Sequence, residues 1–335
     1  MACVTVENKI INPNTSLNAQ LSVDELNETI SRAYTSYKKY NKNYMPAFIE
    51  QVTKLAHTFL TETYNKYGHT TNTIKIPEIF TIDAKDESKI LNEIKTNPIG
   101  IAKVNKKAEC NALIGAIVLF ADQDFFNERP IYLARTIFHE ITHFNCVAWF
   151  EKFNNQIFAI RFGLGIFDPK TRFESNFFEE AYAYYQSAQF AKYILADKAF
   201  EKDADFIKEA IENFVARKII RDNNYIKFEY GLLCHKDFCT IAKDSNGFHP
   251  RFATLYPTLL ERVINSCSDS RELIKRIFEA RLNLDSTYSD NLKASIDDNF
   301  GVGFFNILNS LNRIDDDFQI NAIAEFVQRR NKSDI

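Results

Sequence analysis

The sequence lacks any apolar run long enough to cross a bilayer, and its first twenty residues contain no unbroken hydrophobic segment of the kind found in secretory signals. Glu7, Lys9 and several asparagines interrupt that stretch. We therefore expect a soluble cytoplasmic protein for which the membrane is not a partner.

Closely spaced cysteines are also missing. The chain has six cysteines, scattered along its length: Cys3, Cys110, Cys146, Cys234, Cys239 and Cys267. This scatter is typical of reduced thiols rather than of a disulfide framework. Cys234, His235 and Cys239 resemble half of a structural zinc site, but such a site needs four ligands, and only Cys267 could add another.

Basic stripes, repeats, low-complexity tracts and flexible linkers are absent as well. The net charge is −3, which argues against nucleic acid as the main partner. Hydrophobic residues make up 45% of the chain, enough for a sizeable core. These features predict a globular enzyme of one compact body or two lobes, whose oligomeric state the sequence leaves open.

The most informative feature present is an HExxH motif formed by His139, Glu140 and His143. It lies in a segment that we predict to be helical from about Pro130 to Phe153. Two histidines four residues apart share one helix face, so both imidazoles can reach a single ion. A carboxylate beside them can take the proton of a zinc-bound water as that water attacks a carbonyl. The alternative is that the spacing arose by chance.

A catalytic zinc site normally has three protein ligands and leaves the fourth position to water. The best source of a third ligand is the predicted helix that starts near Asn176, where Glu179 and Glu180 interrupt aromatic and small residues. Acidic side chains are seldom buried without a partner. A metal ion would supply that partner.

At this point the chain resembles the gluzincin metallopeptidases, which combine HExxH with a downstream Glu-x-x-Ala. Glu180 begins a matching Glu-Ala-Tyr-Ala segment, so the resemblance implies one Zn²⁺ per chain bound by His139, His143 and Glu180, with Glu179 as the second choice. It also implies that Glu140 is the general base and that the substrate is a peptide or protein. The resemblance extends from Ile114 to Gln186.

Related enzymes often stabilise the oxyanion with a histidine or tyrosine far downstream. The resemblance therefore makes His249 and Tyr256 candidate catalytic residues, and Arg251 lies in the same stretch. The alternative for each is a residue that serves only local structure.

We expect a predominantly helical α+β fold. It would comprise an irregular N-terminal arm over residues 1–21, a zincin-like lobe with a small sheet and the active-site helix over 22–175, and a helical lobe over 176–335 that carries the third ligand. By resemblance, the β-prone run Leu113 to Phe120 is the edge that pairs with substrate. An interior strand is the alternative.

The helices and other strands are expected in the following segments: Ser22 onward, Met45 to Tyr67, Ile76 to Ile82, Ser88 to Lys95, Gly100 to Val104, Asn176 to Ala196, Ala204 to Arg221, Leu255 to Asn265, and Asp269 onward with two or three shorter helices to Arg330. Two functions fit this organisation. The first is a zinc-dependent peptidase, and the second is a catalytically inactive scaffold that holds a peptide or protein in its groove. The intact Glu140 favours the first.

Overall fold

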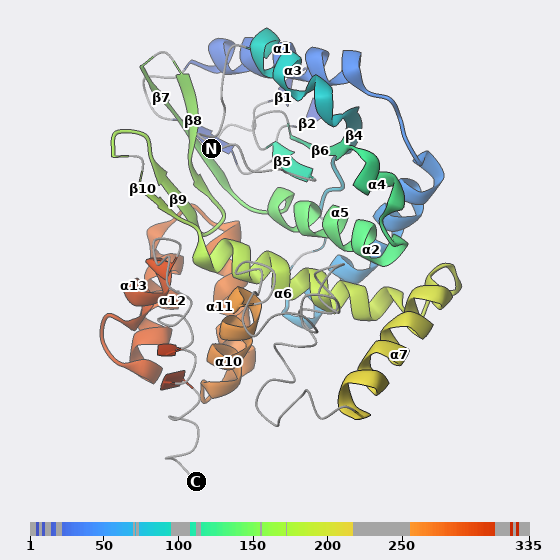
Figure 1. Cartoon of the computed structure of the whole chain (residues 1–335). Coiled ribbons are helices and arrows are strands. Elements are labelled where there is room, and N and C mark those ends of the chain that lie inside the picture. Colours follow the sequence, from blue (N-terminus) through green and yellow to red (C-terminus); the bar gives the residue numbers. More distant parts are fainter. Residues whose placement is uncertain are drawn as a thin grey trace. The chain divides into compact units, whose positions relative to one another are not determined.

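The computed structural model describes residues 5–6, 9–10, 15–17, 22–69, 71, 74–94, 108–111, 115–154, 156–171, 173–216, 255–311, 322–323 and 326–327 of the chain. Helices predominate and the sheets are small, which confirms the predicted α+β class (Figure 1). No helix in this described part is long and apolar enough to cross a membrane.

The chain divides into two compact units, each built from separated segments. The first unit comprises Met1–Asn127, Thr136–Glu174 and Phe278–Tyr288. The second comprises Glu128–Arg135, Ser175–Ile277 and Ser289–Ile335. Each lobe expected from the sequence is one continuous stretch of the chain, whereas each observed unit consists of three separate stretches.

The first unit begins with the two predicted helices, α1 (Val23–Tyr40) and α2 (Pro46–Lys66). Ser22 and Glu25 form a capping box at the start of α1: the Ser22 hydroxyl accepts from the Glu25 N–H at 3.1 Å, and the Glu25 carboxylate accepts from the Ser22 N–H at 3.3 Å. Proline at the first position opens α2, where its missing N–H costs nothing.

A three-stranded sheet follows, in the order β4-β6-β5, with β4 (Glu78–Asp83) parallel and β5 (Ala108–Asn111) antiparallel to β6 (Ala116–Ala121). The 3-10 turn η2 (Ala84–Asp86) and helix α3 (Glu87–Ile94) connect β4 to the rest of the sheet. All of β6 is buried, and alternate residues of β6 pack with α1 and α3 in one core cluster.

This topology decides between the two interpretations of the run Leu113 to Phe120. Because β6 pairs with β4 on one side and β5 on the other, it offers no free edge to a substrate. The edge-strand prediction is wrong, and the interior strand is confirmed. A strand buried on both faces reads as a continuous apolar run, which is what the sequence contains.

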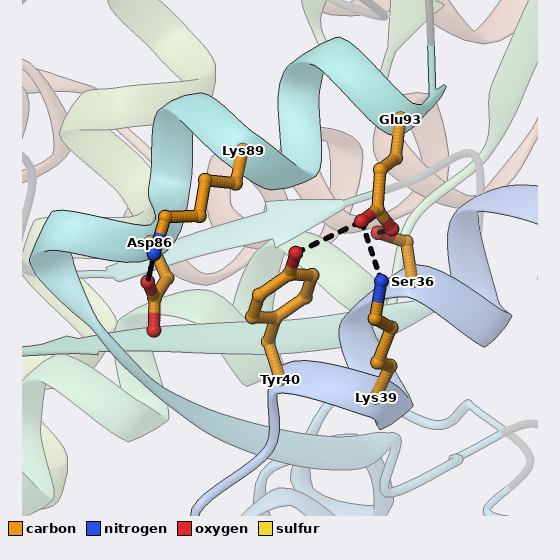
Figure 2. A network of polar contacts seen from close by, with 6 residues as sticks. All are labelled: Ser36, Lys39, Tyr40, Asp86, Lys89 and Glu93. Carbon is orange, nitrogen blue, oxygen red and sulfur yellow. Dashed lines mark hydrogen bonds and ion pairs between the residues drawn. The ribbon is translucent and has the colours of Figure 1, made fainter.

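A polar network ties α3 to α1 at the surface of this sheet layer (Figure 2). The Glu93 carboxylate accepts hydrogen bonds from Lys39 Nζ at 2.6 Å, Tyr40 Oη at 2.8 Å and Ser36 Oγ at 2.9 Å. These donors, Lys39 first, lower the pKa of Glu93 to about 2. The carboxylate therefore stays ionised at neutral pH.

A second, five-stranded sheet has the order β10-β9-β8-β7-β3. Its strands are β3 (Thr15–Leu17), β7 (Ala148–Phe153), β8 (Gln156–Phe162), β9 (Gly165–Asp168) and β10 (Phe173–Ser175). The helix predicted to reach Phe153 is therefore wrong beyond Phe144, because the segment from Ala148 forms the first strand of a hairpin. The N-terminal arm contains β1 (Thr5–Val6), β2 (Lys9–Ile10) and β3, which pairs parallel to β7.

The second unit is helical in its described part. Helix α6 (Phe177–Ile194) is buried around most of its circumference and packs against α10 (Tyr256–Ser266) and α13 (Phe304–Asn309). The remaining elements are η3 (Lys198–Phe200), α7 (Glu201–Ala216), α11 (Ser270–Leu282), whose end belongs to the first unit, and α12 (Ser286–Phe300). Within the described residues these elements confirm the predicted helices to within a few residues, whereas the predicted helix end at Arg221 and most of the stretch from 312 to 330 lie outside the described residues. The strand expected from Gly100 to Val104 lies outside the described residues.

Candidate metal centre

The HExxH motif lies near the end of α5 (Pro130–Phe144), which follows β6 and the short helix α4 (Gln123–Asn127). Pro130 takes the first helical position, as expected. Ile137, Phe138 and Ile141 have no exposed surface, so the helix presents its apolar stripe to the interior. Phe138 packs edge-on against Phe59 of α2, with ring centroids 5.4 Å apart.

A buried acid holds the start of α5. Asp203 of α7 is 3% exposed and accepts a hydrogen bond from the Ile131 N–H in the first turn, where the helix dipole favours a negative charge. Burial raises the pKa of Asp203, although Arg129, with Nη1 3.9 Å from the carboxylate, acts in the opposite direction. The Arg129 guanidinium lies 3.7 Å from the centroid of the Phe206 ring.

His139 and His143 lie on one face of α5, as the spacing predicts. Both are buried, at 7% and 6% exposure, and their Nε2 atoms are 3.1 Å apart with the rings at 84°. Phe162 of β8 packs against the His143 ring, with centroids 6.0 Å apart. The structure thus directs both Nε2 atoms to one point in an apolar setting.

The distance between the two Nε2 atoms fits a bound zinc ion. Two nitrogen ligands about 2.0–2.1 Å from a tetrahedral zinc are about 3.3 Å from each other. The observed separation of 3.1 Å is close to that value. At this distance the two nitrogen atoms can either share one proton in a hydrogen bond or bind one cation together. The donor set, two neutral imidazoles, is one that zinc prefers.

Glu140 directly follows the first histidine and is half-buried. Consecutive helical residues differ by about 100° around the axis, so its carboxylate borders the face that carries the histidines. The position is compatible with a base that works beside the ion without binding it.

Glu179 and Glu180 lie in the first turn of α6, in the second unit. Glu179 is 2% exposed, whereas Glu180 is half-buried, and the Glu180 N–H bonds to the Asn176 carbonyl at 2.9 Å. The positive end of the helix dipole favours both carboxylates there. Because neighbouring helical side chains diverge, the two carboxylates differ in direction and should differ in effect when replaced.

Buried side chains bind the last carbonyls of α5. Arg281 Nη2 donates to the Thr142 carbonyl at 2.9 Å, and Asn145 Nδ2 donates to the Ile141 carbonyl at 2.8 Å. The Cys146 thiol points at the His143 carbonyl, 2.8 Å away. Sequence reasoning missed these residues. Asparagine directly after a helix is a recognisable C-terminal signal, but nothing local indicates Arg281.

The chain matches no protein-family model, no curated protein and no solved structure. Any interpretation of the site therefore depends on the residues themselves and on the chemistry that their geometry allows.

The structure says less about the candidate oxyanion residues. Tyr256 is fully buried at the start of α10, and its ring packs edge-on against Phe177 of α6 with centroids 4.9 Å apart. This packing is the role that the structure describes, and the catalytic role stays a prediction. His249 and Arg251 lie outside the described residues, as do Cys234, His235 and Cys239.

Proposed function

We propose that the protein is a zinc-dependent peptidase in which His139, His143 and Glu180 bind one zinc ion. The observation that carries this proposal is the pairing of the two motif histidines, whose Nε2 atoms are 3.1 Å apart on one buried face of α5. Glu180 is proposed as the third ligand because it begins the Glu-x-x-Ala segment downstream of the motif. Two neutral imidazoles and one carboxylate form a donor set typical of catalytic zinc, with a fourth position left for water.

When bound, zinc supplies Lewis acidity, which lowers the pKa of a coordinated water and polarises a carbonyl group. Glu140 accepts a proton from the attacking water and passes it to the leaving amine. His139 and His143 must be neutral to bind the ion, because each offers the ion a ring nitrogen lone pair. The same residues that hold the ion thus leave Glu140 free for proton transfer.

We further infer a zincin-like arrangement for the first unit. The support is the order of its elements: a small mixed sheet, in which β6 is the central strand, leads through α4 into the helix with the HExxH motif. The expected substrate is a peptide or protein. Since β6 is interior, any pairing with an extended peptide would have to use another strand, and β5 ends the described three-stranded sheet.

The test is the metal content of the purified protein. Wild type is loaded with zinc, passed over a chelating resin and measured by elemental analysis beside the Glu180→Ala and Glu179→Ala variants. We expect about one zinc per chain in wild type, as in catalytic zinc sites generally. Glu180→Ala should lose most of it and Glu179→Ala should retain it.

The outcomes separate the possibilities. Loss of zinc from Glu179→Ala with retention in Glu180→Ala would transfer the ligand role to Glu179. Wild type without zinc would overturn the proposal, because the two histidines would then form an ordinary hydrogen bond. In that case the inactive scaffold becomes the better interpretation.

A further inference from the structure

His143 lies in the weakest part of its helix. Helix α5 ends at Phe144, so His143 is in the last turn, while His139 is one turn further inside. The last four carbonyl groups of a helix have no partner within it, and helix ends fray. Metal–ligand distances, in contrast, must be held to within about 0.2 Å. A histidine at this position needs support from outside the helix.

Two buried side chains provide such support, and they come from different parts of the first unit. Arg281, at 2% exposure, binds the Thr142 carbonyl through Nη2, and its own carbonyl accepts from the Val147 N–H at 2.9 Å. Thr142 lies just before the end of α5 and Val147 just after it. Arg281 is therefore joined to the chain on both sides of the point where the helix ends, through its guanidinium before that point and through its backbone carbonyl after it.

Asn145, at 7% exposure, is fixed even more fully. Its Nδ2 donates to the carbonyls of Ile141 at 2.8 Å and Lys75 at 2.9 Å, and its Oδ1 accepts from the Lys75 N–H at 2.9 Å. Lys75 lies shortly before β4. The last turn of α5 is thus joined to the segment that leads into β4 of the three-stranded sheet.

The type of residue at position 281 also matters. An apolar side chain could fill the same volume without the cost of burying a charge. It would, however, leave the Thr142 carbonyl without this donor. A cation at the end of a helix also interacts favourably with the negative end of the helix dipole.

We propose that Arg281 and Asn145 are positioning residues for the metal centre: they fix the last turn of α5 and so hold His143 at the distance from His139 that one ion requires. This inference rests on the proposed zinc site. Neither residue needs to touch the ion or the substrate.

The test compares zinc affinity rather than activity. Arg281→Met and Asn145→Ala are titrated with zinc in competition with a chromophoric chelator, and the absorption spectrum of each Co²⁺-loaded variant reports the ligand geometry. Loss of residues that orient metal ligands typically weakens binding by about 10–100-fold, and we expect that range here, with a changed Co²⁺ spectrum. Phe80→Leu is the control. Phe80 belongs to the core cluster formed by α1, α3 and the three-stranded sheet, and that cluster includes no residue of α5.

Loss of zinc affinity in both variants, with wild-type affinity in a Phe80→Leu protein of equal thermal stability, supports the proposal. If the variants and Phe80→Leu lose stability alike but bind zinc as wild type does, Arg281 and Asn145 serve only the fold. If Arg281→Met does not fold, Asn145→Ala is judged by the same criterion. A wild-type protein that binds no zinc would overturn the metal site itself, so the two failures are distinguishable.

Discussion

Arg281 Nη2 donates a hydrogen bond to the carbonyl of Thr142, the residue directly before His143. The guanidinium thereby meets the negative end of α5, and Asp203 meets its positive end at the Ile131 N–H. Each end of the helix with the candidate metal ligands binds a buried ionisable side chain whose charged form has the sign that the helix dipole favours. Such a helix is a rigid platform of the kind that a precise ligand geometry needs.

Replacing Glu140 with glutamine should separate metal binding from catalysis. The amide keeps the size of the side chain but cannot accept a proton, so hydrolysis should fall by about 10²–10⁴-fold while zinc content stays at the wild-type level. Turnover can be followed by mass spectrometry of new termini in a peptide library. Glu50→Gln, on the exposed surface of α2, is the control and should behave as wild type. Undiminished cleavage by Glu140→Gln would exclude it as the general base.

Zinc should stabilise the folded protein. An ion that binds only the folded state adds about 2.7 kcal/mol at a free concentration 100 times its dissociation constant. We expect the melting temperature of wild type to rise with zinc and to fall again with a chelator. His143→Ala should show no such response, whereas His57→Ala, at an exposed position on α2, should respond fully. An equal response in both variants would place the zinc elsewhere.

Glu93 should make the fold sensitive to acid. Its pKa is lowered from 4.5 to about 2, first by the hydrogen bond from Lys39, so the ionised network stabilises the folded state above pH 4.5. That contribution is lost as the pH falls from 4.5 towards 2. Denaturation midpoints measured from pH 7 to pH 3 should therefore decline more steeply for wild type than for Glu93→Gln. Parallel curves would mean that the network of Figure 2 does not contribute in solution.

The capping box of α1 offers a test of local stability. Ser22→Ala removes the hydroxyl that binds the Glu25 N–H, and it should lower the free energy of unfolding by about 1 kcal/mol. Ser22→Asp, which restores an acceptor at the cap, should regain most of the loss. Chemical denaturation measures both. Because Ser22 is exposed, the substitution to alanine does not alter the packing of the core. An unchanged free energy of unfolding in Ser22→Ala would therefore contradict a stabilising role of the capping box.

The boundaries of most elements follow from local sequence signals. Ser22 with Glu25 and Asp269 with Glu272 are helix starts that can be identified without a structure, and both are observed. The end of α5 is different, since the apolar pattern continues through Val147 and Phe150 and resembles more helix. Only pairing with β8 shows that these residues belong to a strand. A periodicity signal cannot report a hydrogen-bond partner that comes later in the chain.

The sequence by itself determined that His139 and His143 share one face of a helix, because their spacing is a local property of the chain. Tertiary structure alone decided that β6 is an interior strand and that Arg281, 139 positions from Thr142, holds the last turn of α5. These features depend on contacts between distant segments. Such contacts arise only when the whole core assembles, and no local pattern encodes them.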